Sequence, residues 1–171
     1  MPTEIKGTAG ELPAGKIAII VSRYNESITG QLLAGAVQTL QQGGVNDDDI
    51  QIVHVPGAWE LPLPAAYVAG NREVLAVICL GAVIKGETSH DQHINRSVCN
   101  ALMDIGLESG KPVLLGLLTC NTVDQAIQRA GGNMGNKGAE CASAALEMIR
   151  VTEQVGKRET PRAGFNDASH G

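Results

Sequence analysis

The chain has 171 residues, of which 43% are hydrophobic, and this is enough for one globular domain with a sizeable core. Its 13 Lys and Arg residues against 18 Asp and Glu residues give a formal net charge of −5 at pH 7, and no basic run occurs, so we expect no binding to nucleic acid. No apolar run is long enough to cross a bilayer, and residues 1–15 lack the apolar stretch of a secretory signal, so we expect a cytoplasmic protein without membrane contacts.

Short apolar stretches alternate with helical patterns along the chain. Pro62 and Pro64 fit the second helical pattern only if they lie near its start. In chain order, the sequence predicts a strand at residues 16–21, a helix at 26–42, a strand at 49–55, a helix at 59–69, a strand at 74–80, a helix at 89–109, a strand at 112–118, and helices at 123–130 and 138–155.

The predicted strands are apolar throughout and are separated by helices, which is typical of a parallel sheet covered on both faces. With right-handed crossovers this gives an α/β fold: a three-layer α/β/α sandwich of the flavodoxin-like type with a four-stranded parallel sheet. We expect residues 1–15 to form an N-terminal arm and residues 16–155 a single domain. Residues 156–171 show no periodicity, and we expect a disordered C-terminal tail there.

Ligands of such folds bind beyond the carboxyl ends of the strands. The chain's only Trp, one of its two Tyr residues and several charged side chains gather in the segments expected at those ends, which are residues 22–25, 56–60, 82–90 and 119–121. Scattered core residues would not gather in this way, so we expect a binding site at this edge of the sheet.

The segment from Ala82 to His90 follows the third predicted strand and precedes a long helical pattern. Free backbone N–H groups and the positive end of a helix dipole converge at such a place, which favours an anion such as phosphate. His90 lies at the expected helix start, so the segment combines a phosphate site with a group that can transfer protons.

Metal binding is not expected from the pattern of cysteines and histidines. Cys79, Cys99, Cys120 and Cys141 form no C-x-x-C pair, and we expect reduced, mostly buried thiols, as suits a cytosolic protein. His93 lies one helical turn after His90, but no convincing third ligand for zinc is present.

Four segments, in order, resemble the lumazine synthase family. They are residues 22–26 (SRYNE), 55–62 (VPGAWELP), 81–90 (GAVIKGETSH) and 125–138 (QAIQRAGGNMGNKG), and the resemblance covers residues 17–149. It implies condensation of 5-amino-6-(D-ribitylamino)uracil with 3,4-dihydroxy-2-butanone 4-phosphate to 6,7-dimethyl-8-ribityllumazine in riboflavin biosynthesis, with release of phosphate and water. No cofactor and no metal would take part.

The resemblance also implies roles for individual residues. His90 would be the general acid and base. Gly86, Glu87 and Thr88 would form the phosphate loop, with Arg129 from the adjacent subunit completing it. The pyrimidine and its ribityl chain would contact Tyr24, Asn25, Ala58, Trp59, Glu60, Val83 and Ile84 of one subunit and Leu115, Lys137 and Glu140 of the next.

Several of these side chains also have a simpler explanation. Tyr24 could cap the core, Trp59 could be ordinary packing, and Asn25 could serve turn chemistry. Glu60 could be an acid favoured by a helix dipole, while Lys137 and Glu140 could form an exposed i, i+3 ion pair of little energetic value.

The chain departs from the family pattern at two places. Leu115 stands where the family often has Phe, so stacking on the substrate there would be lost. After His90 the family often has an aromatic residue and an acid, but Asp91 and Gln92 follow here.

The resemblance implies a homopentamer with sites shared between neighbours. Because residues 131–138 are compact and carry no insertion, we favour further packing of pentamers into a hollow icosahedral shell of sixty chains. Riboflavin synthase is a candidate partner. The alternative function is a non-catalytic, flavodoxin-like protein that binds a flavin or a phosphorylated ligand, but it would not need His90, Arg129 and Lys137 together.

Overall fold

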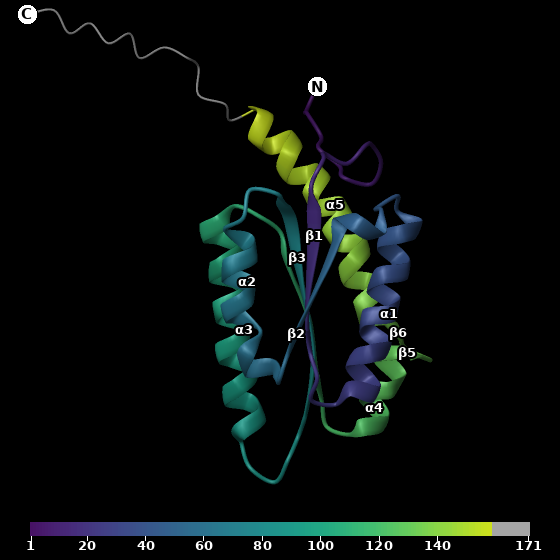
Figure 1. The fold of residues 1–171 in the computed structure, drawn as a ribbon, viewed down its shortest axis with the longest axis vertical. Helices are drawn as coiled ribbons and strands as arrows, with labels where there is room; N and C mark the ends of the chain where they lie inside the picture. Colours follow the sequence, from purple (N-terminus) through teal and green to yellow (C-terminus); the bar gives the residue numbers. More distant parts are fainter. Residues whose placement is uncertain (159–171) are drawn as a thin grey trace, which may run out of the picture.

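A four-stranded parallel sheet separates two layers of helices, as Figure 1 shows for the computed structural model, which describes residues 1–158. The strands are β1 (Lys16–Ser22), β2 (Ile50–Val55), β3 (Val74–Ile84) and β4 (Val113–Cys120), and they lie in the order β2-β1-β3-β4. All three pairings between neighbouring strands are parallel, so the four carboxyl ends lie at one edge of the sheet.

Helices cover both faces of this sheet. On one face lie α2 (Pro62–Ala69) and α3 (His90–Ser109), and on the other lie α1 (Glu26–Gln42), α4 (Val123–Arg129) and α5 (Lys137–Arg158) (Figure 1). Two short 3-10 turns, η1 (Asp47–Asp49) and η2 (Ala58–Glu60), flank β2. The predicted three-layer α/β/α sandwich with a four-stranded parallel sheet is therefore confirmed.

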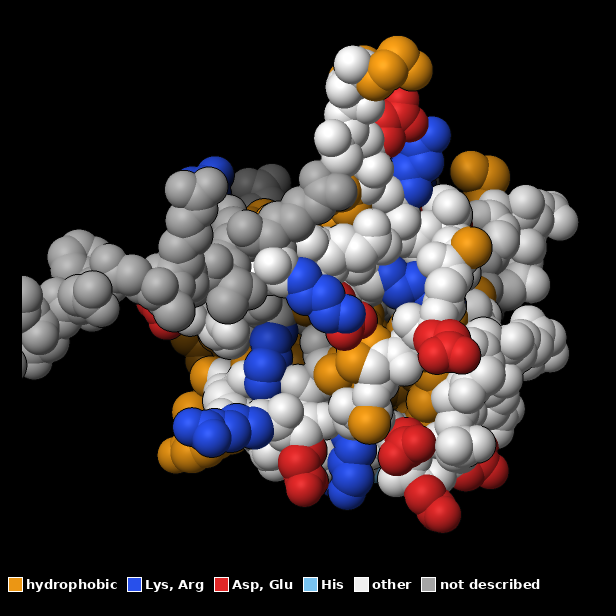
Figure 2. Space-filling view, turned by 90° about the horizontal axis from the view of Figure 1, so that it is seen from above, with side chains coloured by type: hydrophobic (Ala, Val, Ile, Leu, Met, Phe, Trp, Pro, Cys, Tyr) orange, Lys and Arg blue, Asp and Glu red, His pale blue; other side chains and the backbone are white. Residues whose placement is uncertain are grey.

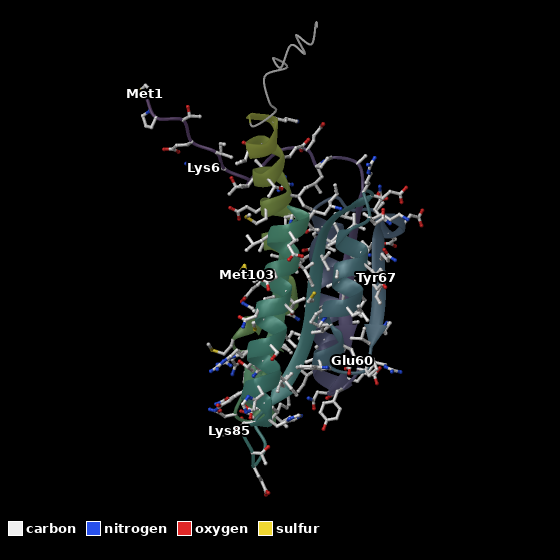
Figure 3. All side chains as sticks on the ribbon, turned by 90° about the vertical axis from the view of Figure 1, so that its left-hand side faces the viewer. Met1, Lys6, Glu60, Tyr67, Lys85 and Met103 are labelled. Carbon is white, nitrogen blue, oxygen red and sulfur yellow. The ribbon has the colours of Figure 1, made fainter. Side chains whose placement is uncertain are left out.

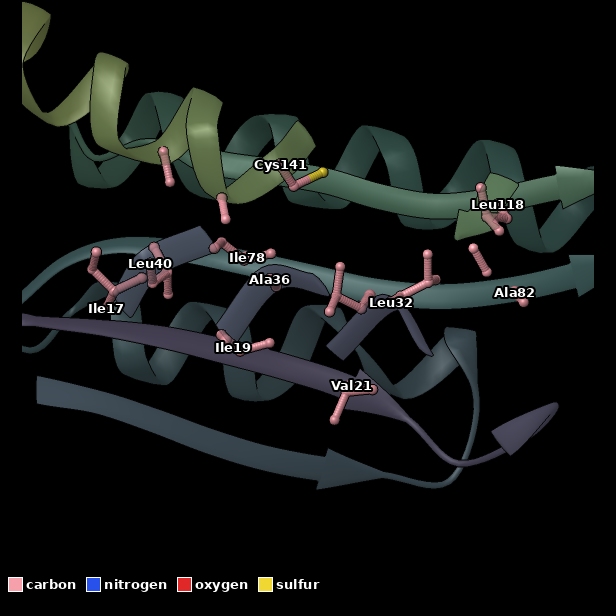
Figure 4. Packing of buried hydrophobic residues seen from close by; sticks show 14 of the residues in the cluster. Ile17, Ile19, Val21, Leu32, Ala36, Leu40, Ile78, Ala82, Leu118 and Cys141 are labelled. Carbon is pink, nitrogen blue, oxygen red and sulfur yellow. The ribbon is translucent and has the colours of Figure 1, made fainter. Parts of the chain in front are cut away.

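The alternation of side chains along β1 builds two separate cores. Ile17, Ile19 and Val21 face α1 and α5, whereas Ala18 and Ile20 face α2 and α3. Figure 4 shows the first of these cores, in which side chains from α1, α5 and the strands meet. All five of these β1 side chains are at most 2% exposed, which explains why the strand is apolar without interruption.

The strand β3 is longer than the sequence predicts. It continues through Gly81 to Ile84, because these residues pair in register with the end of β4, from Leu117 to Cys120. The connecting loop before α3 is correspondingly shorter, and α3 begins at His90 itself.

The structure also differs from the prediction at the start of the second helix and in the segment after α4. The second helix starts at Pro62 rather than at Trp59, because proline fits the first position of a helix and residues 58–60 form the turn η2 instead. A small hairpin, β5 (Ala130–Gly132) with β6 (Gly135–Asn136), lies between α4 and α5 and was not predicted, because its glycine-rich sequence carries no apolar alternation.

The N-terminal arm and the last turns of α5 meet beyond the amino ends of the strands. The N-terminal arm lies on α5, where the Arg150 guanidinium donates to the carbonyl oxygens of Gly10 (3.0 Å) and Gly7 (3.2 Å). The helix α5 runs to Arg158, so residues 156–158 belong to it and not to the expected tail. The remainder of that tail, residues 159–171, lies outside the described residues.

Figure 2 shows this end of the molecule in space-filling form. Basic and acidic side chains are interspersed over the described part of this face, and they do not gather into one basic patch. None of the described helices is long and apolar enough to span a membrane.

The close approach of α5 to α1 at Gly138 generates a prediction on stability. A methyl group on Gly138 would overlap the carbonyl oxygen of Leu32, which is backbone and cannot move aside cheaply. We expect Gly138→Ala to lower the free energy of unfolding by about 1–3 kcal/mol, measured by urea denaturation.

The control is Gly30→Ala, inside α1, where an added methyl group would meet no atom within 4 Å. This variant should be more stable than the original chain by roughly 0.5–1 kcal/mol, because alanine favours a helix over glycine. Equal stability of the two variants would contradict the packing described for α1 and α5.

Candidate active site

A cleft of about 410 Å³ opens at the carboxyl ends of the strands, on the side covered by α2 and α3. Its lining comes from three parts of the sequence: the turn after β1, the segment around η2, and the stretch that runs from the end of β3 through the following loop into the start of α3. The residues that line it are Tyr24, Gly57, Ala58, Trp59, Glu60, Ala82, Val83, Ile84, Gly86, Thr88, His90, Asp91 and Ile94.

Most of the residues predicted for one subunit's half of the site are therefore brought together. Figure 3 shows two of the segments involved, marked by Glu60 and Lys85, at the same end of the molecule. Asn25 and Glu87 do not line the cleft.

Two aromatic side chains border the cleft with most of their surface uncovered. Tyr24 is 74% exposed and Trp59 is 60% exposed. Neither ring is packed into the core of the described chain, so capping or ordinary packing does not explain them. Exposed aromatic rings beside a cleft are typical of a surface that a planar ligand or another chain covers.

Asn25 has a structural task. Its backbone adopts the left-handed conformation, with φ of 63°, and its side-chain Nδ2 donates to the carbonyl oxygen of Ala82 at 3.0 Å. This bond ties the turn after β1 to the end of β3. Turn chemistry is thus present at Asn25, and contact with a ligand stays a prediction.

Glu60 is held by the turn in which it lies. Its Oε2 accepts a hydrogen bond from the backbone N–H of Gly57 at 2.9 Å, which leaves Oε1 as the oxygen available to a ligand. This contact fixes the carboxylate at the mouth of the cleft, and Ala58 beside it is almost fully buried.

The loop between β3 and α3 supplies the polar end of the cleft. Its start is fixed because the Lys85 N–H donates to the Cys120 carbonyl oxygen at 2.8 Å. The Thr88 hydroxyl oxygen accepts from the backbone N–H of His90 at 3.3 Å, and His90 is the first residue of α3. The start of a 20-residue helix, which carries the positive end of the helix dipole, therefore lies at the cleft.

The other predicted residues lie elsewhere on the chain. Arg129, Lys137 and Glu140 line a second hollow of about 210 Å³ together with Leu118 and Met134, on the α4 and α5 side of the sheet. Leu115, 42% exposed, lies on the edge strand β4 beside α3.

The side chains of Arg129 and Lys137 in the second hollow each contact another side chain of the same subunit. Arg129 Nη1 donates a hydrogen bond to Cys120 Sγ, and the two atoms lie 3.4 Å apart. Lys137 Nζ lies 3.5 Å from Glu140 Oε2, and both side chains are largely exposed, so this i, i+3 pair contributes little to stability.

Sequence reasoning did not name four residues that line the cleft. Gly57 and Ala82 lie in segments that were expected there, whereas Asp91 and Ile94 lie outside them. Both lie on α3 within a turn of His90 and share with it the face directed at the cleft. Helical periodicity counted from His90 would have identified Ile94, four residues on, but not Asp91, which directly follows His90.

All four cysteines are free thiols and none lines the cleft. Burial raises the pKa of Cys141 to about 11 and that of Cys79 further, so both stay protonated at neutral pH. In residues 1–158, no group of three or more His, Cys, Asp or Glu side chains could hold a metal ion.

Comparison with known proteins decides the family. A sequence model described as 6,7-dimethyl-8-ribityllumazine synthase matches residues 14–153. A 6,7-dimethyl-8-ribityllumazine synthase from Rhodopirellula baltica (strain DSM 10527 / NCIMB 13988 / SH1) is 52% identical over 155 residues, which make up 91% of this chain and 99% of that relative. The chain belongs to the 6,7-dimethyl-8-ribityllumazine synthase family.

Membership of the lumazine synthase family confirms the resemblance found in the sequence. It also confirms the expectation of an enzyme, a transferase of riboflavin biosynthesis, and does not favour the non-catalytic flavodoxin-like alternative. The roles of the individual residues remain predictions that the geometry of the cleft can sharpen.

The conformation of Asn25 generates a prediction about its contribution to stability. Alanine at this position would lose the bond to Ala82 and would be strained at positive φ, whereas glycine would lose only the bond. We expect Asn25→Ala to lower the free energy of unfolding by about 2–3 kcal/mol and Asn25→Gly by about 1 kcal/mol, measured by urea denaturation. An alanine variant as stable as the glycine variant would show that the turn carries no strain.

Proposed function

We propose that this cleft is where 5-amino-6-(D-ribitylamino)uracil condenses with 3,4-dihydroxy-2-butanone 4-phosphate to give 6,7-dimethyl-8-ribityllumazine, phosphate and water. Family membership supports the reaction. The observation that carries the location is the meeting, in one cleft, of two uncovered aromatic rings with a histidine at a helix N-terminus and a glycine-containing loop.

The pyrimidine ring would lie against Tyr24 and Trp59. A planar ring stacked on an aromatic face gains roughly 0.5–1.5 kcal/mol beyond its burial, and both rings are uncovered. Val83 and Ile84, which are partly buried, would border the ring from β3. Ala58 and the Oε1 of Glu60 would face the ribityl chain, with Glu60 accepting from its hydroxyl groups.

The phosphate group would bind at the loop before α3. Gly86 and Thr88 line the cleft, so backbone N–H groups and a hydroxyl are available there. Glu87 lies in the same loop but does not line the cleft, which is consistent with a carboxylate that stays away from the bound phosphate.

The chemistry needs orientation and proton transfer. The amine of the pyrimidine attacks the ketone and water is lost, which forms an imine. Phosphate is then eliminated, and the resulting enol tautomerises to a ketone. The second nitrogen attacks this ketone and closes the ring with loss of a second water. The amine is already a nucleophile and phosphate is a good leaving group, so holding the two substrates together supplies most of the acceleration. His90 would move protons between the nitrogen, carbon and oxygen atoms that change partners.

The site would be completed by a second chain. Arg129, Lys137 and Glu140 lie on the other side of the sheet from the cleft, so a neighbour would have to bring its own copies to the bound substrates. Arg129 would bind the phosphate as a guanidinium fork, and Leu115 of the neighbour would give apolar cover. Head-to-tail contacts of this kind close into a ring when the rotation between neighbours permits it, and the ring that the family resemblance implies is a homopentamer.

Larger assembly and location are part of the same proposal. The segment between α4 and α5 is the compact hairpin of β5 and β6, which fits packing of pentamers into a shell of sixty chains. Free thiols fit a cytoplasmic location. Riboflavin synthase, which consumes the lumazine product, is the proposed partner.

The proposed role of His90 is tested by substitution. We expect His90→Ala to lower kcat by roughly 100-fold or more without loss of stability, because the side chain is exposed and general acid–base groups contribute about that much. Lumazine absorbance and released phosphate report turnover.

His93→Ala is the matched control, since His93 lies one turn along the same helix, is exposed, and does not line the cleft. It should retain nearly full turnover. A fall of equal size in both variants would argue for damage to the start of α3, and an unchanged kcat in His90→Ala would rule out the proton-transfer role.

A further inference from the structure

One residue that lines the cleft, Asp91, carries a buried side-chain oxygen for which the described chain provides no donor. Among the described residues, three buried side-chain oxygens have no hydrogen-bond partner, namely Ser22 Oγ, Asp91 Oδ1 and Asn95 Oδ1. Only Asp91 belongs to a residue that lines the cleft. It follows His90 directly and stands where the family often has an aromatic residue.

A buried carboxylate oxygen without a donor is costly. Nearly all buried polar atoms in folded proteins are paired, and an unpaired one at a ligand-binding cleft calls for a partner from outside the chain. The other carboxylate of the cleft, Glu60, differs in this respect because its Oε2 is already bonded to the Gly57 N–H. Asp91 thus lines the cleft and carries an unused acceptor, and because that oxygen is buried in the ligand-free chain, the carboxylate has to turn toward the cleft for a ligand to reach it.

The chemistry of a carboxylate decides which substrate group can be its partner. An ionised carboxylate accepts hydrogen bonds and donates none, and it repels a phosphate dianion. A substrate with N–H and O–H groups and no negative charge fits it. Of the two substrates in the proposed function, the ribitylamino-uracil carries such groups on its ring, its amines and its side chain.

We propose that Asp91 binds the pyrimidine substrate by accepting a hydrogen bond from one of its N–H or O–H groups. This inference rests on the proposed function. It adds a residue that favours one substrate over the other at its wall of the cleft. Asp91 draws the uncharged, donor-rich substrate to the α3 wall of the cleft. By the same charge it disfavours the phosphorylated substrate there, so the phosphate stays at the loop formed by Gly86 and Thr88.

Asn95 is the competing partner within the chain. It lies one turn after Asp91 on α3, its own Oδ1 is buried and unpaired, and its amide can donate from the opposite orientation. If Asn95 were the donor, Asp91 would hold the helix start and would be needed for stability. The two possibilities therefore predict opposite effects on the stability of the ligand-free protein.

The experiment measures binding of 5-amino-6-(D-ribitylamino)uracil alone, by calorimetry, to the full-length protein and to Asp91→Ala. We expect the dissociation constant to rise by roughly ten-fold or more, since a hydrogen bond to a charged group is lost. The KM for the phosphorylated substrate should not rise. The melting temperature of the free protein should stay unchanged or increase, because a buried unpaired oxygen has been removed.

Asp91→Asn is the conservative variant, which keeps one acceptor oxygen without the charge and should bind the pyrimidine with intermediate affinity. Asp104→Ala is the matched control for charge, because Asp104 is exposed on the same helix and does not line the cleft. Its dissociation constant should match that of the original chain.

Two results would overturn the inference. One is an unchanged dissociation constant in Asp91→Ala while the original chain turns over both substrates. The other is a lowered melting temperature in Asp91→Ala that Asn95→Ala reproduces, which would assign the pair to the structure of α3. Absence of turnover and of pyrimidine binding in the original chain would instead overturn the proposed function, and the inference with it.

Discussion

The parallel pairing of β3 with β1 on one side and β4 on the other is the constraint on which the rest of the structure depends. Because parallel strands end at the same edge, this pairing brings together segments as distant as Tyr24 and His90. Two hydrogen bonds then fix the loops at that edge: Asn25 Nδ2 to the Ala82 oxygen, and the Lys85 N–H to the Cys120 oxygen. The cleft is therefore a property of the sheet and not of any one loop.

The same sheet keeps the two groups of proposed site residues apart. The cleft lies on the side of α2 and α3, and the hollow around Arg129 lies on the side of α4 and α5. A chain arranged in this way presents half of a site on each side. Association in a ring would place the second half of one chain opposite the first half of the next, which links the proposed catalysis to assembly.

Much of this arrangement can be predicted from the sequence, because apolar strands and helical periodicity determine the layers. The end of β3 was missed since Gly81 resembles a loop residue, and only pairing with β4 shows otherwise. The cleft residue Asp91 was missed because the family pattern has no acid there, and its unpaired oxygen is visible only in three dimensions. The hydrogen bond from Asn25 to the Ala82 carbonyl oxygen is likewise a tertiary contact that turn propensities do not reveal.

The most direct test of the central claim, that each site is completed by a neighbouring chain, mixes two inactive variants. His90→Ala and Arg129→Ala chains are co-expressed in equal amounts with different tags, and assemblies carrying both tags are purified and assayed. If neighbours share the site, about one quarter of the sites combine an intact His90 with an intact Arg129, and turnover returns to about that fraction. If each chain forms its own site, the mixed assemblies stay as inactive as the separate variants, and that result would contradict the account.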